Sequence, residues 1–487
     1  MALGLSILES IAELPNHGNA RASAWMTADF FIKQRPVAGP SHTVMRSQRS
    51  LFSMGMLWVL PMIAGTVQAD TASSPDGAVS SFIVLCDCAT PEARTRIQQA
   101  IKSTGGYVRY TYENLGGFAV EAPDSVSPVQ LEQQLRRIKG VSLVEPDGES
   151  HTSSPPSSAD RSAINNSSRM NDIPPRLQWE ANYGYCGETA LISAGLYYGQ
   201  YASQFDTRAI ASPGIKQSRR GSQLLLGVND EAAAAHVHLK AVEWDSSVTT
   251  TNANNFLAWV KGNVVSGYPV IIGVYENFSK FDDSEDEDAG DNEYDHIVPV
   301  IGVSSAKPGT QPAAYDADDV VTLSDNGLWS PDGQPAFIYR FKFGAFQATR
   351  QQANDEARPV YSLPGEGKNY GVAITGVMDR DGKTLPVRLT TDVNQERPAM
   401  DEGSNTRPAS ATVNLTAMVS GLTPGVRYTL YRYDSFDNVP ESGFNEKSAA
   451  ADKRWDINIK SGSTYVVKEA IRSDQVAVYR AVPVTAP

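Results

Sequence analysis

A polar stretch from residue 148 to residue 175 divides this chain of 487 residues and limits what the chain can fold into. The stretch is rich in Ser, Asn and Pro and has no hydrophobic periodicity, which is typical of a linker. Exposed segments of this kind are also common sites of proteolytic processing. We therefore expect a separate N-terminal unit followed by larger globular regions, roughly two to four domains in all.

A second segment without periodicity, residues 351–368, separates a middle region, 176–350, from a C-terminal region, 369–487. In the C-terminal region, stretches such as VRYTLYRYDS alternate in strand-like fashion between Gly and Pro turns. This pattern predicts an antiparallel β-sandwich. With helical and strand-like stretches in the preceding regions, the expected fold class is α+β.

The amino-acid composition limits the classes of molecule that this chain is expected to bind. The chain has 41% hydrophobic and 20% charged residues, which is typical of a globular protein. Its net charge of -13 argues against nucleic acid as a partner, because phosphate binding needs clustered Lys and Arg. An acidic surface of this kind mainly favours solubility.

An apolar run near the start has the pattern of a secretory signal. Arg46 and Arg49 precede an apolar core over residues 51–65, and Val67-Gln68-Ala69 supplies the small residues of a cleavage site. The run of about 15 apolar residues is interrupted by Pro61 and is shorter than the roughly 20 residues that span a bilayer. The pattern therefore indicates export and not a membrane anchor.

Residues 45–69 are thus predicted to be a signal peptide, with Asp70 near the mature start. The protein is expected to be secreted or periplasmic, with no membrane span after signal removal. Because Met45 stands where a signal peptide normally begins, residues 1–44 are interpreted as a dispensable extension.

Residues 81–147 read as strand, helix, strand, strand, helix, strand. Thr90-Pro91 and Ser127-Pro128 each place a capping residue before a first-turn proline, and apolar residues at helical spacing follow both pairs. This split βαβ order predicts a ferredoxin-like sandwich of about 70 residues.

The same segment resembles the inhibitor propeptide that precedes subtilisin-like proteases. The resemblance is carried by the strand at Phe118-Ala119-Val120 and by the ending from Gly140 to Asp147. It implies a domain that assists folding and temporarily inhibits the enzyme that follows, so the chain's own prodomain would be a partner in cis. The alternative is a small ferredoxin-like domain with another binding role.

The chain has three cysteines, an odd number for an exported protein. Cys86 and Cys88 lie on the same face of a predicted strand, where they either bond to each other or stay buried. Cys186 is then left over, which makes it a candidate reactive thiol.

Cys186 lies in a Gly-Tyr-Cys-Gly turn directly before apolar residues at helical spacing. A helix N-terminus offers free N–H groups and the positive end of the helix dipole, which favour the reactive thiolate form of a cysteine. This position indicates a nucleophile, and a nucleophilic cysteine needs a base nearby.

Three histidines follow the linker, and His296 is the best candidate base because it opens the apolar strand HIVPVIGVSS directly after a loop. His236 and His238 lie in a segment that looks locally helical, where a structural or surface role is expected. The next strand, VVTLSDNGLWS, ends in Asp325 and Asn326, and either could orient the imidazole. Asp325 is preferred, because it continues the alternating face of the strand.

The pieces YGYCGETAL, GYPVIIGV, DHIVPVIGV and LSDNGLW resemble, in this order, the papain-like cysteine peptidase superfamily, most nearly its bacteriocin-leader-processing branch. The resemblance implies a papain-like α+β catalytic domain over residues 176–350. It implies Cys186 as nucleophile, His296 as general base and acid, and Asp325 or Asn326 as the orienting group.

The chain departs from this family in its oxyanion donor. The family usually has a Gln six residues before the Cys, but that position here is Glu180, which accepts hydrogen bonds when ionised. The nearby amides of Gln178 and Asn182 are the candidate donors. One of them, with the Cys186 backbone N–H, would stabilise a tetrahedral oxyanion.

The loop over residues 282–295 is strongly acidic. Three readings are open for it: a calcium site, although its spacing does not match an EF-hand loop, selectivity for basic substrates, or a solvated acidic loop. No other cofactor is expected.

The leading hypothesis is a secreted cysteine peptidase made as a zymogen, with a peptide or protein as substrate. The same triad would also serve an acyltransferase that passes the acyl group to an amine or thiol. A third possibility is a catalytically inactive binding protein whose N-terminal domain inhibits other proteases, and Glu180 in place of Gln keeps this possibility open.

Overall fold

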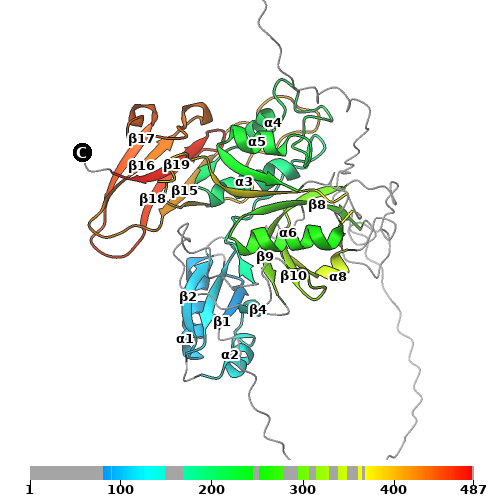
Figure 1. The fold of residues 1–487 in the computed structure, drawn as a ribbon, viewed down its shortest axis with the longest axis vertical. Coiled ribbons are helices and arrows are strands. Elements are labelled where there is room, and N and C mark those ends of the chain that lie inside the picture. Colours follow the sequence, from blue (N-terminus) through cyan, green and yellow to red (C-terminus); the bar gives the residue numbers. More distant parts are fainter. Residues whose placement is uncertain are drawn as a thin grey trace, which may run out of the picture.

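The computed structural model describes residues 81–88, 90–112, 115–123, 126–147, 168–244, 252–277, 294–305, 314–327, 338–347, 360–364 and 368–484. These residues form a mixed α+β fold with seven α-helices and several antiparallel sheets (Figure 1). The expected extension, the signal peptide, residues 148–167 of the linker and residues 282–293 of the acidic loop lie outside the described residues.

The N-terminal domain has the predicted order of strands and helices. Its elements are β1 (Ser81–Cys86), α1 (Pro91–Ser103), β2 (Tyr107–Tyr112), β3 (Gly117–Glu121), α2 (Pro128–Leu135) and β4 (Val141–Asp147). Thr90 caps α1, since its side-chain oxygen accepts a hydrogen bond from Ala93 N at 3.2 Å. The sheet order β2-β3-β1-β4 places both helices in split βαβ crossovers.

The two faces of this sheet have different neighbours. One face forms the domain core with α1 and α2, and Cys86 and Cys88 are joined there as a disulfide. The other face carries the apolar side chains of Ile83, Leu85, Tyr112 and Ala119, with Leu115 and Leu143 beside them; Met170 and Ile338 pack against this group. The domain therefore docks on the middle of the chain through an apolar sheet face (Figure 1).

A sheet of eight strands forms the centre of the molecule, in the order β11-β10-β9-β8-β13-β7, with β12 paired to β8 and β5 to β9. The bounds are β5 (Arg169–Met170), β7 (Leu239–Glu243), β8 (Val270–Glu276), β9 (His296–Ser304), β10 (Val320–Ser324), β11 (Ile338–Lys342), β12 (Tyr361–Ser362) and β13 (Gly371–Val377).

The central sheet corrects the predicted domain boundary at residue 350. Strand β13 hydrogen-bonds to both β8 and β7, so the middle domain continues to Val377. The segment predicted as a linker, 351–368, contains β12, which pairs with the end of β8. The Pro and Gly residues of this segment indicated a linker, but its short strand forms because it pairs with β8, and it shows no hydrophobic periodicity of its own.

Helices cover both faces of the central sheet. Their bounds are α3 (Cys186–Tyr197), α4 (Gln204–Ala211), α5 (Asp230–His236), α6 (Ala253–Val265) and α8 (Phe343–Phe346). Helix α3 is buried along its whole length and shares an apolar core with Ile271 and Ile297, whereas α6 packs on the opposite face against Val298 and Val300. Because α3 has no polar face, it acts as the central packing element of the molecule.

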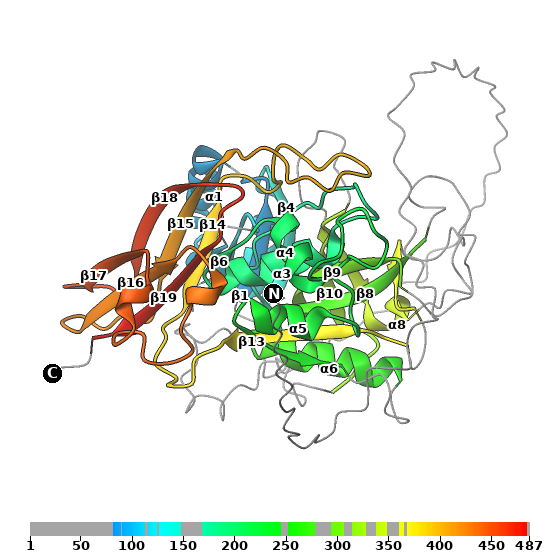
Figure 2. The ribbon, with the colours of Figure 1, turned by 90° about the horizontal axis from the view of Figure 1, so that it is seen from above.

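Two antiparallel sheets form the predicted C-terminal sandwich (Figure 2). Its strands are β14 (Val387–Thr391), β15 (Thr412–Val419), β16 (Arg427–Tyr433), β17 (Lys453–Asn458), β18 (Tyr465–Arg472) and β19 (Ala477–Pro483). The sandwich begins at β14 and not at residue 369, because β13 belongs to the central sheet. Strand β6 (Gln200–Tyr201), which follows α3, pairs with β19 and joins the two domains.

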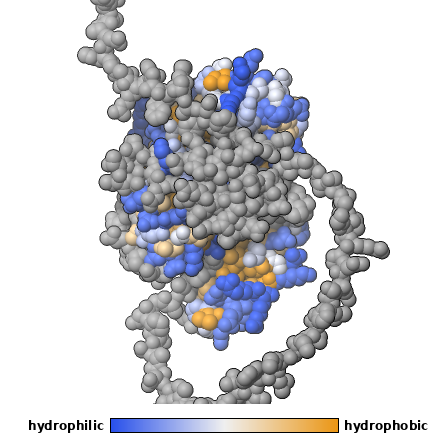
Figure 3. All heavy atoms as spheres, turned by 90° about the vertical axis from the view of Figure 1, so that its right-hand side faces the viewer, coloured by the Kyte–Doolittle hydropathy of each residue, from blue (hydrophilic) through white to orange (hydrophobic). Residues whose placement is uncertain are grey.

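On the face shown in Figure 3, the described surface is mostly hydrophilic with small apolar groups between the polar ones. Among the residues that the structure describes, no helix is long and apolar enough to cross a membrane.

Candidate active site

A left-handed turn leads into Cys186. Asn182, Tyr183 and Gly184 have φ angles of 54°, 67° and 76°, a conformation that non-glycine residues rarely adopt. Tyr185 then occupies the N-cap position, and Cys186 is the first residue of α3, as the sequence predicted. The Cys186 thiol is free of disulfide and 2% exposed. It lies at the helix end whose N–H groups interact favourably with negative charge.

Strands β9 and β10 bring His296 and Asp325 together. His296 opens β9, and Asp325 directly follows β10, its antiparallel neighbour, so both lie at one edge of the sheet. His296 Nε2 is 3.2 Å from Asp325 Oδ1, and the ring also hydrogen-bonds to the Cys186 side chain. Because Nε2 is directed to the carboxylate, Nδ1 is the ring nitrogen that faces the thiol.

The surroundings shift the proton affinities of His296 and Asp325 in opposite directions. Both side chains are fully buried. Burial alone lowers the pKa of His296, but hydrogen bonds to Asp325 and Cys186 outweigh it and raise that pKa well above its usual range. Burial alone raises the pKa of Asp325, but hydrogen bonds from His296 and Tyr361 outweigh it and lower that pKa. An imidazolium beside a carboxylate is therefore the favoured state of the pair.

Tyr361 is a site residue that sequence reasoning missed. Its hydroxyl donates a short hydrogen bond to Asp325 Oδ2, and its ring lies against the His296 ring with centroids 5.8 Å apart and planes 23° apart. Burial and the Asp325 charge raise the pKa of Tyr361 well above its usual range, so the phenol remains a donor. The signal in the sequence was the short apolar run Val360-Tyr361-Ser362-Leu363 between two prolines.

Asn326 does not orient the imidazole. Its side-chain amide donates to the carbonyl oxygens of Cys186, at 2.9 Å, and Ile297, at 3.1 Å. The backbone carbonyl oxygen of Asn326 accepts a hydrogen bond from Gln178 N at 2.8 Å. Asn326 therefore ties together α3, β9 and the segment before the turn, and the carboxylate on His296 is that of Asp325.

Gln178 is the better placed of the two candidate oxyanion donors. Gln178 Oε1 accepts a hydrogen bond from Tyr185 N at 3.1 Å. The side-chain NH₂ group of Gln178 therefore points away from Tyr185 N. Gln178 Nε2 and His296 Nε2 both border Gly327: a Cβ on Gly327 would lie 3.0 Å from Gln178 Nε2 and 3.2 Å from His296 Nε2. The side-chain amide of Gln178 and the imidazole thus border the same glycine, and only glycine fits there without displacing one of them.

The other candidate donor, Asn182, turns away from the thiol. Its side-chain NH₂ donates to Ser404 O at 2.9 Å, and its Oδ1 accepts from Gly403 N at 2.8 Å. Glu180, six residues before Cys186, is exposed.

A buried ion pair holds the turn before the nucleophile. Arg208 Nε lies 2.6 Å from Glu188 Oε1, and both side chains are almost fully buried. The same guanidinium donates to Asn182 O at 2.9 Å and to Gly184 O, and it lies 3.4 Å above the ring of Tyr185. Arg208 thus donates to two of the three carbonyls of the left-handed turn, and the third, Tyr183 O, accepts from Gln223 Nε2 at 2.6 Å. Neither residue was singled out from sequence, where a charged pair 20 residues apart carries no signal.

The other two histidines behave as expected from the sequence. His236 is exposed on the last turn of α5. His238 follows the helix with a φ of 57°, and its carbonyl accepts from Met378 N at 2.8 Å. Burial and the charge of Arg480 lower the pKa of His238. No hydrogen bond joins either ring to Cys186 among the described residues.

No group of three or more His, Cys, Asp or Glu side chains suited to a metal is found within the described parts of the chain. The calcium site considered for the acidic loop falls on residues 282–293, which lie outside those parts. The chemistry available at the described site is that of a thiol, an imidazole, a carboxylate and an amide.

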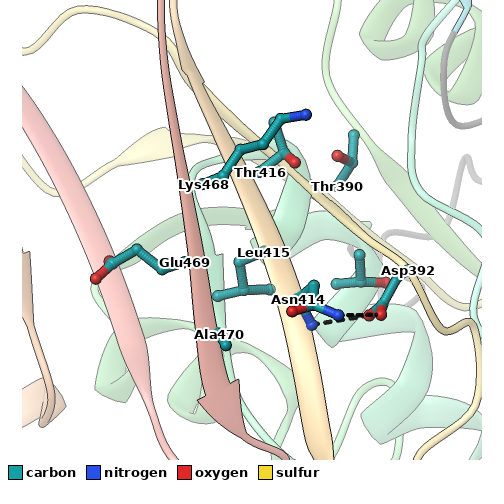
Figure 4. A pocket seen from close by; sticks show the side chains of 9 residues that line it. Thr390, Asp392, Asn414, Leu415, Thr416, Lys468, Glu469 and Ala470 are labelled. Carbon is teal, nitrogen blue, oxygen red and sulfur yellow. Dashed lines mark hydrogen bonds between the residues drawn. The ribbon is translucent and has the colours of Figure 1, made fainter.

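A hollow of about 470 Å³ lies on the outer side of the sandwich sheet β14-β15-β18 (Figure 4). Two of the polar residues that line it, Asn414 and Glu469, already have partners within the fold. The backbone and side-chain N–H groups of Asn414 donate to Asp392 at 2.8 and 2.6 Å, and Glu469 accepts from Lys453 and Tyr479 at 2.6 and 2.7 Å. With these groups saturated, the hollow offers weaker chemistry than the Cys186 site.

Comparisons with protein-family models, with curated proteins and with solved structures found no match. The functional argument therefore depends on the geometry of the site.

Proposed function

We propose that this chain is a secreted cysteine peptidase of the papain-like superfamily, nearest its bacteriocin-leader-processing branch. It hydrolyses peptide bonds through an acyl-enzyme on Cys186. The observation that carries the proposal is the continuous hydrogen-bonded series from Cys186 through His296 to Asp325 at the start of a buried helix. A nucleophile, a base and a group that orients the base are the parts that acyl transfer requires.

In the proposed reaction, the Cys186 sulfur attacks the carbonyl carbon of the scissile peptide as a thiolate beside protonated His296. The raised pKa of His296 supports this pairing, since it keeps the ring protonated until the leaving amine needs a proton. The C–N bond then breaks, the imidazole proton passes to the amine, and a thioester remains on Cys186. Neutral His296 next takes a proton from the water that attacks the thioester carbonyl. The C–S bond breaks, the acid product leaves, and the thiolate beside protonated His296 is restored.

The tetrahedral oxyanion would be stabilised by the Cys186 backbone N–H and the side-chain NH₂ of Gln178. Gln178 supports this role through its position beside His296 and through Tyr185 N, which fixes its amide orientation. Removing an oxyanion donor of this kind lowers kcat by about 10²- to 10³-fold. Asp325 keeps the ring in the tautomer that presents Nδ1 to the thiol.

The proposal is tested by alkylation and by turnover. Iodoacetamide near neutral pH should modify Cys186 rapidly, and peptide mapping should find Cys86 and Cys88 protected as a disulfide. Hydrolysis of fluorescein-labelled casein should disappear in Cys186→Ala, while circular dichroism shows that the fold is retained. A folded protein, cut in the linker 148–175, in which Cys186 is inert to the reagent would exclude the peptidase proposal.

Acyl transfer is the second candidate function, and burial of the site favours considering it. Cys186, His296 and Asp325 are all at most 2% exposed, so access of water to a thioester is restricted. Adding hydroxylamine or glycine amide to a single-turnover reaction separates the two outcomes. A transferase should give mainly the aminolysis product, and a peptidase should give mainly the free acid.

We further propose that the N-terminal domain is a ferredoxin-like inhibitor prodomain that keeps the enzyme latent until the linker 148–175 is cut. The resemblance to inhibitor propeptides supports this role, and the domain is docked on the rest of the chain: Leu115 packs against the cluster of Ile173, Tyr197 and Ile301, at the end of α3 opposite Cys186. Tethering gives a bound domain an effective concentration on the order of millimolar, which cleavage removes.

Latency is tested by comparing cut and uncut protein on casein. The uncut chain should be inactive, and added fragment 81–147 should inhibit the chain that starts at Ser168. The fragment 176–350 is unsuitable for this test, because it lacks β13. Equal turnover by the cut and uncut forms would exclude the zymogen proposal. Export is tested separately by secretion of a chain that starts at Met45, which should have Asp70 at or near its new N-terminus.

A further inference from the structure

The segment from Thr391 to Arg407, between β14 and β15, lies against the residues that precede the nucleophile. We call this segment the clasp. It belongs to the C-terminal sandwich, and it lies far in sequence from its partners, from 192 residues between Gln204 and Glu396 to 222 residues between Asn182 and Ser404. Its contacts are directed at the residues on either side of Gln178 and at the turn that follows.

The first part of the clasp holds the residues before Gln178. Arg176 is 2% exposed, and its guanidinium donates to Thr391 Oγ1 at 3.1 Å and to Val393 O at 2.7 Å. Leu177 N donates to Asn394 O at 2.9 Å. A buried arginine and a backbone hydrogen bond thus anchor the chain one and two residues before the amide.

The carboxyl group of Glu396 holds the residue after Gln178. Both of its oxygens accept from Gln204 N, at 2.9 and 3.0 Å, and its backbone carbonyl accepts from the Trp179 indole at 3.0 Å. The Gln204 side chain in turn accepts from Trp179 N at 2.8 Å and donates to Leu177 O at 3.1 Å. The backbone on both sides of Gln178 is therefore fixed through Glu396.

The last part of the clasp holds the left-handed turn. Asn182 N donates to Glu402 Oε2 at 2.9 Å, and the Asn182 side chain exchanges hydrogen bonds with the backbone of Gly403 and Ser404. Met400 is buried against Trp179 and Tyr185. The strained first residue of the turn is thus stabilised by partners from the other domain.

We infer that the clasp is a positioning element of the active site, through which the C-terminal sandwich sets the Gln178 amide beside His296. This inference depends on the proposed function of Gln178 as the oxyanion donor. Gln178 itself is bonded to Asn326 O and Tyr185 N, but its neighbours on both sides are bonded to the clasp or to Gln204, which the clasp holds. The sandwich is therefore required for the chemical step and is not a separable accessory domain.

The test uses p-nitrophenyl acetate, a small activated ester that needs no peptide subsite, and measures the burst of acylation by folded enzyme that has been cut in the linker 148–175. Glu396→Ala should slow the burst by about tenfold or more, and Gln178→Ala by about 10²-fold. Glu396→Gln, which retains an acceptor for Gln204 N, should stay within about threefold of the parent. Asp401→Ala, which changes an exposed side chain of the same loop, is the matched control.

Two readouts separate positioning from loss of fold. Alkylation of Cys186 by iodoacetamide needs no oxyanion donor, so its rate should remain within about twofold in Glu396→Ala. In the Gln178→Ala background, Glu396→Ala should add little further loss, because both changes remove one interaction.

Unchanged acylation in folded Glu396→Ala, or a loss of the same size in both backgrounds, would overturn the positioning inference and leave the nucleophile proposal intact. If the parent enzyme shows neither alkylation nor a burst, the proposed function fails and the inference fails with it. If Glu396→Ala is unfolded, Glu402→Ala should reproduce the effect at the turn, and no effect there would also overturn the inference.

Discussion

Replacing Arg208 by Met should both destabilise the fold and displace the nucleophile turn. The substitution leaves Glu188 buried without its 2.6 Å partner, and breaking a buried ion pair on one side costs about 3–5 kcal/mol. It also removes the donors to Asn182 O and Gly184 O, at about 1 kcal/mol each when water does not replace them. We expect a loss of roughly 5–7 kcal/mol in the free energy of unfolding, a large part of the stability of a typical domain.

The double variant Arg208→Met, Glu188→Gln divides this loss into its causes. Gln removes the uncompensated charge and keeps an acceptor for Leu224 N, which donates to Glu188 Oε1 at 3.0 Å. The double variant should therefore recover about 2 kcal/mol or more of the stability lost in the single variant. The carbonyls of the turn remain without their donor, so Cys186 should still be placed incorrectly.

The assay combines urea unfolding, followed by tryptophan fluorescence, with the rate of Cys186 alkylation in the absence of urea. Alkylation should stay slow in the double variant even though stability returns. If the two substitutions destabilise additively, the ion pair is not the source of the cost. If alkylation recovers together with stability, Arg208 acts on the fold alone and not on the position of the turn.

Three further predictions concern the pair of His296 and Asp325 and the clasp. His296→Ala should lower kcat/KM by about 10²- to 10⁴-fold while His236→Ala leaves it unchanged, and the reverse order would show that the base is misassigned. Tyr361→Phe keeps the ring against His296 but removes a hydrogen-bond donor to Asp325, so the pKa of Asp325 should rise. The acid limb of the pH–activity profile should therefore move to higher pH. A limb that does not move would argue against this hydrogen bond. Burial raises the pKa of Glu396 from 4.5 to about 8. Between pH 4.5 and about pH 8 the folded state therefore binds a proton at Glu396 that the unfolded state has lost. The contribution of Glu396 to the free energy of unfolding falls as pH rises through this range. The melting temperature of the parent should therefore drop more between pH 5 and pH 8 than that of Glu396→Gln, and parallel curves would contradict the assignment.

The position of Arg176 explains why burial dominates the titration of Glu396. Its Nη2 lies 3.8 Å from Glu396 Oε1, which is too long for a direct hydrogen bond. The guanidinium instead donates to Thr391 and Val393. The charge of Arg176 lowers the pKa of Glu396 only in part, and the carboxyl keeps its proton at neutral pH.

The candidate site shows how far local patterns could reach. The helix start at Cys186 and the strand start at His296 were predictable, because each depends on the spacing of apolar residues within a dozen positions. The choice between Asp325 and Asn326 was predicted from strand alternation, and the structure places the carboxylate of Asp325 on the imidazole. Tyr361 was not predicted, since its run of four residues between prolines is too short to show a period.

The sequence alone determined the order of elements in the N-terminal domain, the antiparallel sandwich and the residue types that meet at the site. Periodicity and capping are local, so these features are readable from the chain itself. Only the tertiary structure decided that β13 enters the central sheet, that Gln178 and not Asn182 faces His296, and that the clasp holds the nucleophile segment. Backbone N–H and C=O groups are identical along the chain, so which distant segments pair depends on how the apolar faces pack and not on any local pattern.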